Sequence, residues 1–258
     1  MTSPPPYPSL TARYAALTKK TSAERLAEAK SLLPGDKLAN EFNKAVEAFE
    51  SFATGDPFFP HNSDRDKDKN PKSDARTYGW AMKMKAQDEV EVDGDPDLNF
   101  RYVEREIIPT RTKPALPFAD SEGAPVRVDL ILANASSGRP IVGELKIGSD
   151  KDPFTGLVQA LASAAQLCSS AQRERLRQLP QGSHLATETA EPLVDIYVLL
   201  ANFPSTGRHR FEQLQVAVEI ARNLESKSLC EGLGRVSVLA LSGAGGTVSA
   251  TTEIPNPG

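Results

Sequence analysis

The sequence predicts an α/β protein with a mixed central β-sheet, flanked by helices and preceded by an N-terminal helical extension. Three observations predict this class. Between residues 99 and 241, short apolar runs of strand length alternate with longer amphipathic segments. Two of the runs, Val126–Ala133 and Arg139–Ile147, are separated by a short turn that contains Gly138, which is typical of a hairpin. Apolar residues at helical spacing, within residues 22–53, precede all of them.

Length and composition are those of a globular chain. The 258 residues suffice for one large domain or two small ones, and 39% hydrophobic with 25% charged residues is an ordinary balance. A net charge of -4 argues against a basic, non-specific nucleic-acid coat protein. The two cysteines form no Cys-x-x-Cys pair and the three histidines lack zinc-ligand spacing, which argues against a zinc ribbon.

The chain carries no sequence signal for export or membrane insertion. Its first residues, Met1–Pro6, lack the charged start and apolar core of a signal peptide. No apolar run reaches the roughly 18 residues that a membrane span requires. We therefore expect a cytoplasmic protein that does not interact with a membrane.

The N-terminal part, residues 1–76, is predicted to be a helical extension followed by a charged loop. Thr21 and Glu24 form a capping-box pattern, which predicts a helix from Ser22 to about Leu33. Asp36 can cap a second helix to about Ala53. Its apolar side comprises Leu38, Phe42, Ala45, Phe49 and Phe52. The charge run at residues 64–70 is interpreted either as a solvated loop or as a mobile loop beside a binding site.

Residues 77–245 are predicted to form the core of the protein. Thr77–Ala86 fits a strand or a short helix equally well, whereas Asn99–Ile108 reads as a strand. The hairpin follows. Asp152-Pro153 is a strong helix start, and one long helix is expected from there to about Leu179.

The rest of the core continues the alternation. Leu193–Ala201 is predicted to be a buried strand, residues 208–225 an amphipathic helix and Val236–Leu241 the last strand. Residues 246–258 are rich in Thr, Gly and Pro and are expected to form a flexible tail.

Charged residues interrupt the two strands of the hairpin. Asp129, Glu144 and Lys146 stand inside apolar runs, where a charge is costly unless it is paired or binds a metal. Alternation puts Glu144 and Lys146 on one face, and Asp129 on the neighbouring strand can share it. A hard cation such as Mg²⁺ resolves the repulsion of two carboxylates, and the backbone carbonyl of Leu145 is a further candidate ligand. Bound water then becomes acidic enough to attack a phosphodiester, while Lys146 offsets the charge of the transition state.

These residues carry a resemblance. An Asp in one apolar strand, a hairpin to Glu-x-Lys in the next, and a following helix with Gln159 together resemble the PD-(D/E)XK, or restriction-endonuclease-like, nuclease superfamily. The similarity spans residues 99–201 and implies an αβββαβ core. It also implies that Asp129 and Glu144 hold the metal, that Lys146 is the catalytic lysine, and that Gln159 lies near the metal. Val128 and Ser163 differ from the Pro and Tyr that some members have at these places.

The resemblance implies a Mg²⁺- or Mn²⁺-dependent nuclease that hydrolyses phosphodiester bonds, with DNA favoured over RNA. Some members add a Glu from an earlier element, for which Glu106 and Glu41 are the candidates in this chain. The habits of the family imply a role in defence or as a toxin.

Two other functions compete with catalysis. The same fold could serve as an inactive module that binds nucleic acid or a protein partner, although such a module has no need of the three charged residues. Alternatively, the chain could be a structural subunit that docks, or forms a homodimer, through its N-terminal helices. The plainest interpretation, a surface hairpin with a solvated ion pair, does not account for charges inside apolar strands.

Overall fold

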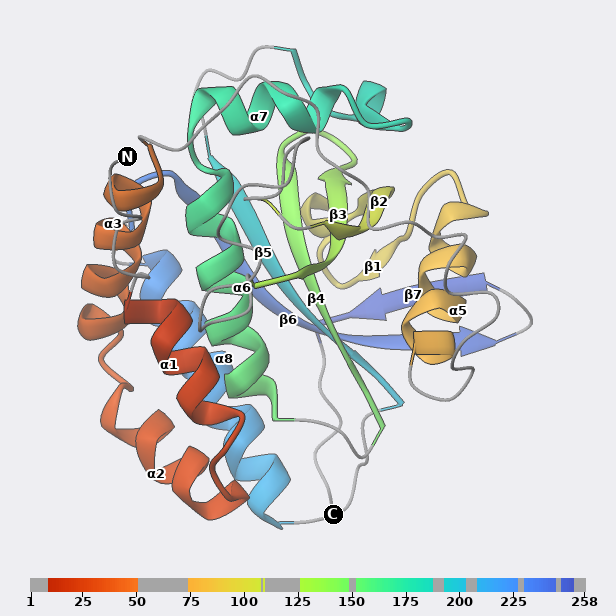
Figure 1. Ribbon diagram of the computed structural model, residues 1–258. Coiled ribbons are helices and arrows are strands. Elements are labelled where there is room, and N and C mark those ends of the chain that lie inside the picture. Colours follow the sequence, from red (N-terminus) through yellow and green to blue (C-terminus); the bar gives the residue numbers. More distant parts are fainter. Residues whose placement is uncertain are drawn as a thin grey trace.

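We describe the chain from a computed structural model. It describes residues 9–50, 74–107, 109, 126–148, 152–187, 193–202, 208–226, 230–244 and 247–252. Helices lie on both sides of one sheet (Figure 1), which confirms the predicted α/β class. Of the helices in these ranges, none combines the length and the apolar character needed to cross a bilayer.

The described strands form one mixed sheet of seven. They are β1 (Val92–Asp93), β2 (Phe100–Ile107), β3 (Val128–Asn134), β4 (Pro140–Ile147), β5 (Val194–Ala201), β6 (Leu233–Ala244) and β7 (Thr247–Thr251). Their spatial order is β1-β7-β6-β5-β4-β3-β2. Strands β2, β3 and β4 are antiparallel neighbours, whereas β4, β5 and β6 run parallel. The predicted hairpin between β3 and β4 is therefore confirmed.

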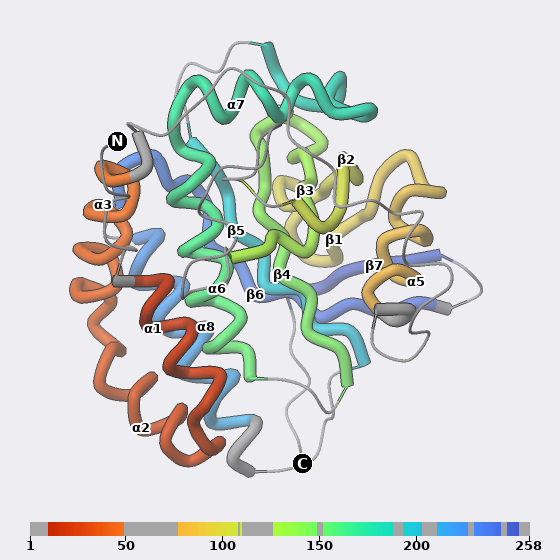
Figure 2. The backbone as a smooth tube through the Cα atoms, viewed as in Figure 1, coloured from red at the N-terminus to blue at the C-terminus, as the bar shows by residue number. Residues whose placement is uncertain are grey.

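The helices are divided between the two faces of the sheet. One face carries α1 (Ser9–Leu17), α2 (Ser22–Ser31), α3 (Asp36–Glu50), α6 (Pro153–Leu167) and α8 (Arg208–Ser226); the other carries α5 (Asp74–Lys85). The tube in Figure 2 shows the first group gathered on one side and α5 on the other. Helix α7 (Ser170–Arg177) follows α6, and the short 3₁₀ turns are η1 (Pro96–Leu98) and η3 (Gly182–His184).

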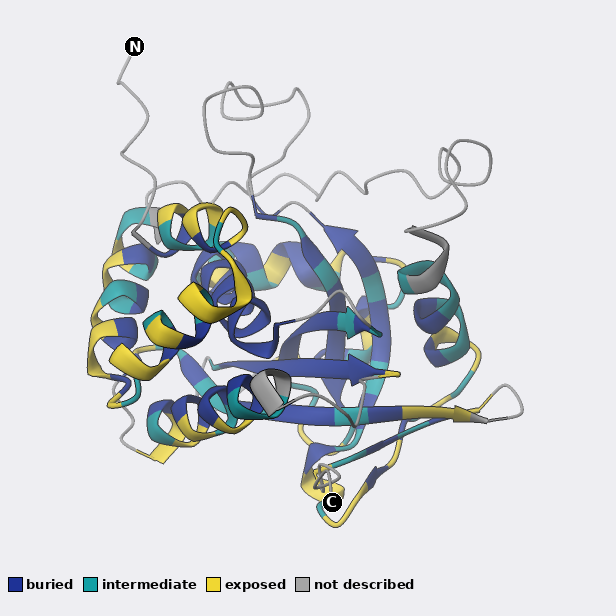
Figure 3. Cartoon of the chain, turned by 90° about the horizontal axis from the view of Figure 1, so that it is seen from below, coloured by how far each residue is buried: buried dark blue, intermediate teal, exposed yellow. Residues whose placement is uncertain are grey.

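Strand alternation sends successive side chains to two separate cores. Val142 and Val198 join the large core beneath α6, whereas Ile141 and Leu199 join the smaller core beneath α5. Helix α6 lies at the centre of the large core, and every residue from Pro153 to Leu167 is buried (Figure 3). The helix thus has no solvated face.

One predicted helix is in fact two. The expected helix from Pro153 to about Leu179 ends at Leu167, and α7 begins at Ser170. Ser169 is the reason, because its hydroxyl accepts a hydrogen bond of 3.3 Å from the N–H of Gln172 and so caps a new helix. Serine favours this role over a place inside a helix.

Two further differences concern the ends of the core. The expected flexible tail is wrong for Thr247–Thr251, which form β7 between β6 and β1. The alternating Thr-Val-Ser-Ala-Thr pattern after Gly245-Gly246 is a hairpin signal, since Gly-Gly is favoured in two-residue turns. The segment Thr77–Ala86, left open as strand or helix, lies mostly in helix α5.

In the N-terminal part, the capping box of Thr21 and Glu24 is confirmed, and α2 and α3 lie where two helices were predicted. Helix α1 had not been predicted. The charge run at residues 64–70 lies outside the described residues, and so does Phe52.

Candidate functional site

The hairpin brings its charged residues to one face. In the register of β3 and β4, Leu130 pairs with Gly143, so Asp129 lies opposite Glu144. Two residues further along their strands, Ile131 and Val142 point into the core beneath α6. The alternation of strands places Asp129, Glu144 and Lys146 on that same face. We call these three residues the hairpin trio.

The trio is closely bonded. The ammonium of Lys146 donates to Oε1 of Glu144 at 2.6 Å, and the backbone N–H of Leu145 donates to Oδ2 of Asp129 at 3.1 Å. The Glu144 side chain is 1% exposed and that of Lys146 is 16% exposed. The second oxygen of Glu144, Oε2, is buried and has no hydrogen-bond partner within the described part of the chain. A buried carboxylate oxygen without a partner is costly, and a cation would satisfy it.

The electrostatics of the trio favour an added cation. Burial raises the pKa of Glu144 well above its ordinary value, and the neighbouring Asp129 carboxylate raises it further, against the opposing effect of Lys146. Burial acts to lower the pKa of Lys146, but the carboxylates of Glu144 and Asp129 outweigh it and raise that pKa. Lys146 therefore remains a cation at neutral pH. With both carboxylates ionised, the trio carries a net charge of about -1.

Helix α6 supplies a fourth side chain. Asp152 caps the helix, accepting a hydrogen bond of 3.0 Å from the N–H of Phe154. Two turns later, the Oε1 of Gln159 accepts from Lys146 at 3.3 Å, while its Nε2 donates to the carbonyl of Arg127 at 3.2 Å. Gln159 thus links Lys146, through two hydrogen bonds, to Arg127 immediately before β3. Because every residue of α6 is buried, the polar side chain of Gln159 lies inside the protein.

A glycine makes room for the lysine. A Cβ atom added at Gly156, in the first turn of α6, would lie 2.8 Å from Cε and 3.3 Å from Cγ of Lys146. Real Cβ atoms do not approach other atoms this closely. The absence of a side chain at Gly156 therefore lets the Lys146 side chain pass over the helix and reach Glu144.

Tyr14 on α1 is a site residue that the sequence gave no reason to select. It is half-buried, and its ring packs against the large core. Burial raises the pKa of Tyr14, and the charges of Glu144 and Asp129 also raise it, against the opposing effect of Lys146. No motif marks Tyr14, because its place depends on how α1 packs against α6.

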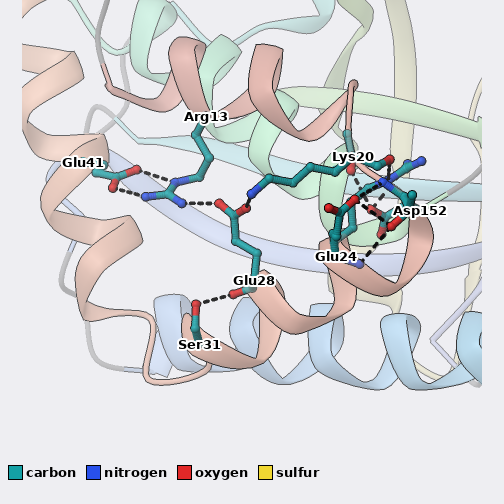
Figure 4. A network of polar contacts seen from close by, with 10 residues as sticks. Arg13, Lys20, Glu24, Glu28, Ser31, Glu41 and Asp152 are labelled. Atoms are coloured by element: carbon teal, nitrogen blue, oxygen red, sulfur yellow. Dashed lines mark hydrogen bonds and ion pairs between the residues drawn. The ribbon is translucent and has the colours of Figure 1, made fainter.

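Of the two further acidic candidates, Glu106 lies opposite Asp129 in the register of β2 and β3, whereas Glu41 lies on α3. Glu41 on α3 accepts from Nε of Arg13 at 2.8 Å and belongs to a network that joins the first three helices (Figure 4). Glu106 lies on β2 with its Oε2 at 3.5 Å from Arg105, and it adopts a left-handed φ of 52°. Over the residues described, no group of three or more His, Cys, Asp or Glu side chains could hold a metal. Among the described residues, the carboxylates of the candidate site are therefore those of Asp129 and Glu144.

Two cavities bordered by described residues lie away from the hairpin trio. One of about 680 Å³ runs beside α8, bordered by Phe211, Arg222 and Thr252, and a smaller one of about 210 Å³ adjoins it near Arg235. Neither touches the hairpin trio.

Fold and site together define an α/β protein with a buried, charged hairpin under a central helix. No protein-family model, curated protein or solved structure matches this chain. The function is therefore inferred from the geometry.

Proposed function

We propose that this protein is a Mg²⁺- or Mn²⁺-dependent nuclease of the PD-(D/E)XK type that hydrolyses phosphodiester bonds, with DNA as the favoured substrate. The observation that carries the proposal is the unpartnered, buried Oε2 of Glu144 beside Asp129 and Lys146. Neither a surface ion pair nor a simple binding module needs a carboxylate in that state.

The arrangement of the strands supports the same proposal. Three antiparallel neighbours, β2, β3 and β4, are followed by α6 and then by β5, which runs parallel to β4. That is the order of elements expected for an αβββαβ core. The charges occupy the second and third strands of that unit, and Gln159 lies on the helix that follows.

The donor set fits a hard divalent ion. Asp129 and Glu144 would hold it, since both offer carboxylate oxygens on one face and Glu144 Oε2 has no other partner among the described residues. When bound, such an ion acidifies water and withdraws charge from a phosphate. Its charge would also relieve the repulsion that raises the pKa of Glu144.

The residues of the chain then have distinct roles in hydrolysis. The oxygen of water forms a bond to phosphorus, the bond from phosphorus to one sugar oxygen breaks, the water proton passes to solvent and the departing oxygen takes up a proton. Because its pKa is raised, Lys146 acts as a fixed ammonium that offsets charge on the phosphoryl oxygens and not as the base. Gln159 holds Lys146 in place.

The test is cleavage of plasmid DNA with Mg²⁺ or Mn²⁺. We expect Asp129→Ala and Lys146→Ala each to lower the rate by about 100-fold or more. Lys37→Ala removes an exposed lysine on α3 and should cut like the natural chain. Equal cutting by all four proteins would refute the proposal. Absence of cutting, with DNA still bound and no Mn²⁺ affinity in calorimetric titration, would favour the inactive binding module.

A further inference from the structure

A series of polar contacts joins helix α2 to the first turn of α6. The guanidinium of Arg25, on α2, lies 3.7 Å from Oδ2 of Asp152, the N-cap residue of α6 (Figure 4). The Nε of Arg25 donates to the carbonyl of Lys20, just before α2, at 3.1 Å. Because the planar guanidinium is bonded on one side and paired on the other, it is held between the two helices.

Asp152 fixes the start of α6 through its side chain and its backbone carbonyl. Its Oδ1 accepts from the N–H of Phe154 at 3.0 Å, and its Oδ2 accepts from the hydroxyl of Thr155 at 2.6 Å. Its carbonyl accepts from the N–H of Gly156 at 3.1 Å. The side chain of Asp152 is only 4% exposed, and a buried carboxylate is costly without an opposite charge, which Arg25 provides.

The same turn determines where Lys146 lies. A Cβ atom at Gly156 would be 2.8 Å from Cε of Lys146, so the lysine side chain runs directly against this turn. Further along α6, the Oε1 of Gln159 accepts from the ammonium of Lys146 at 3.3 Å. A shift of the start of α6 would therefore move both of these contacts. Arg25 is thus connected to Lys146 by a continuous series of contacts between described residues.

We propose that Arg25 is a positioning residue of the site. Through Asp152 and the first turn of α6, it holds the ammonium of Lys146 where the phosphate reacts, and it need not touch the substrate or the metal itself. The inference rests on the proposed nuclease function. It gives the N-terminal helices a part in the reaction besides their share of the core, because a side chain of α2 fixes the start of α6.

The first experiment compares the natural chain, Arg25→Gln, Asp152→Asn and the double variant in Mg²⁺-dependent cleavage of one DNA substrate. Asparagine is also a good N-cap, so Asp152→Asn removes the charge and keeps the helix start. We expect each single variant to lower kcat about 10-fold with little change in KM, because a small misplacement of a catalytic group slows the chemical step. Since both changes break the same contact, the double variant should be no slower than the slower single variant.

Lys30→Gln is the matched control. Lys30 lies on the same helix and pairs with Glu212 on α8 at 3.3 Å. This change therefore also removes one partner of an ion pair between two helices, but it leaves the start of α6 untouched, and cleavage should equal that of the natural chain. The thermal unfolding midpoint of every variant is measured as well. Cleavage is compared well below the lowest midpoint, so that loss of folded protein does not contribute to the rates.

A second readout does not depend on cleavage. In metal-free protein labelled with ¹³C at Cε of its lysines, the NMR signal of Lys146 is the one that Lys146→Arg lacks. Arg25→Gln and Asp152→Asn should each shift this signal, because the turn that contacts Cε moves. Lys30→Gln should remove its own signal and leave that of Lys146 in place.

The outcomes separate this inference from the nuclease function. If the natural chain cuts and Lys146→Ala does not, the nuclease function stands. An unmoved Lys146 signal, or a kcat of Arg25→Gln equal to that of the natural chain, would then overturn the positioning role alone. A raised KM at unchanged kcat would also contradict it, since Arg25 would contact the substrate. If the natural chain does not cut, the nuclease function falls and the role of Arg25 falls with it.

Discussion

At the scale of single residues, Glu144 has the most unfavourable environment for a charge in the site. One oxygen accepts from Lys146 and the other is buried without a partner among the described residues. Burial and the nearby Asp129 both raise the pKa of Glu144. In the absence of metal, an ionised Glu144 therefore costs stability, and this cost gives the metal a measurable effect on folding.

Replacing the Glu144 carboxyl should remove the pH dependence of stability that this group creates. In metal-free protein, the raised pKa of Glu144 means that the unfolded chain releases the proton at lower pH than the folded one. The contribution of Glu144 to stability is then most favourable below the ordinary value of 4.5, and it falls as pH rises from there toward the raised value. We expect Glu144→Gln to be more stable than the natural chain at pH 8, by about 1–3 kcal/mol, and similar near pH 4.

Denaturant unfolding at both pH values, with and without Mn²⁺, measures this effect. Mn²⁺ should raise the stability of the natural chain at pH 8 and leave Glu144→Gln almost unchanged. Glu47→Gln, at an exposed position on α3, serves as the control and should follow the natural chain. A natural chain that is the more stable of the two at pH 8 without metal would contradict the electrostatic account.

The sequence reveals some of these residues and hides others, for physical reasons. Asp129, Glu144 and Lys146 stand out because charge inside an apolar strand is costly and calls for an explanation. Gln159 was found only through the family resemblance. Tyr14 carries no such mark, since a tyrosine in a helix is ordinary and the charges that affect its pKa lie on other elements.

At the scale of elements, α6 decides where Lys146 lies. Its first turn passes so close to β4 that a Cβ atom at residue 156 would require the Lys146 side chain to move. The sheet on one side and α1, α3 and α8 on the other leave the helix little freedom to shift. A small change in this turn should therefore act on the lysine and not on the fold.

We expect Gly156→Ala to displace the ammonium of Lys146 and to lower DNA cleavage by about 10-fold or more, because small misplacements of a catalytic group are costly. Stability should change by less than about 1 kcal/mol, since the better helix propensity of Ala offsets the contact with a flexible side chain. Gly79→Ala in α5 is the matched control: an added Cβ there meets nothing within 4 Å, so stability should rise and cleavage should persist. Undiminished cleavage by Gly156→Ala would show that this glycine does not position Lys146.

Sequence signals predicted a helix or strand well where the whole signal lies within a few neighbouring residues. The capping box before α2 and the Asp152-Pro153 start of α6 fix helix ends within a few residues. Strand β7 was missed because its pairing with β6 and β1 depends on distant partners. The division of α6 from α7 was missed because Ser169 was interpreted as a helical residue and not as a cap.

At the scale of the whole molecule, the N-terminal helices share the large core with the sheet. Residues from α1, α2 and α3 lie in one hydrophobic cluster with residues of α6, α8 and the strands. The sequence suggested an extension because these helices precede the alternating strands. It could not show that their apolar sides cover α6, since long-range packing leaves no local pattern. A partner that docks on them would have to use their polar outer faces.

A chain that begins at Asp74 should therefore lose its native fold. Among the described residues, it would lack six large buried side chains, namely Leu10, Leu17, Leu26, Leu32, Leu38 and Phe42. At about 1.5–3 kcal/mol for each, their loss is comparable to the whole free energy of unfolding of a typical domain, about 5–15 kcal/mol. It would also expose the outer side of α6, which is apolar along much of its length. We expect no cooperative thermal transition, together with binding of a hydrophobic dye. A folded, monomeric product would show instead that the sheet and α6 are stable alone, and would make the N-terminal helices a separable docking unit.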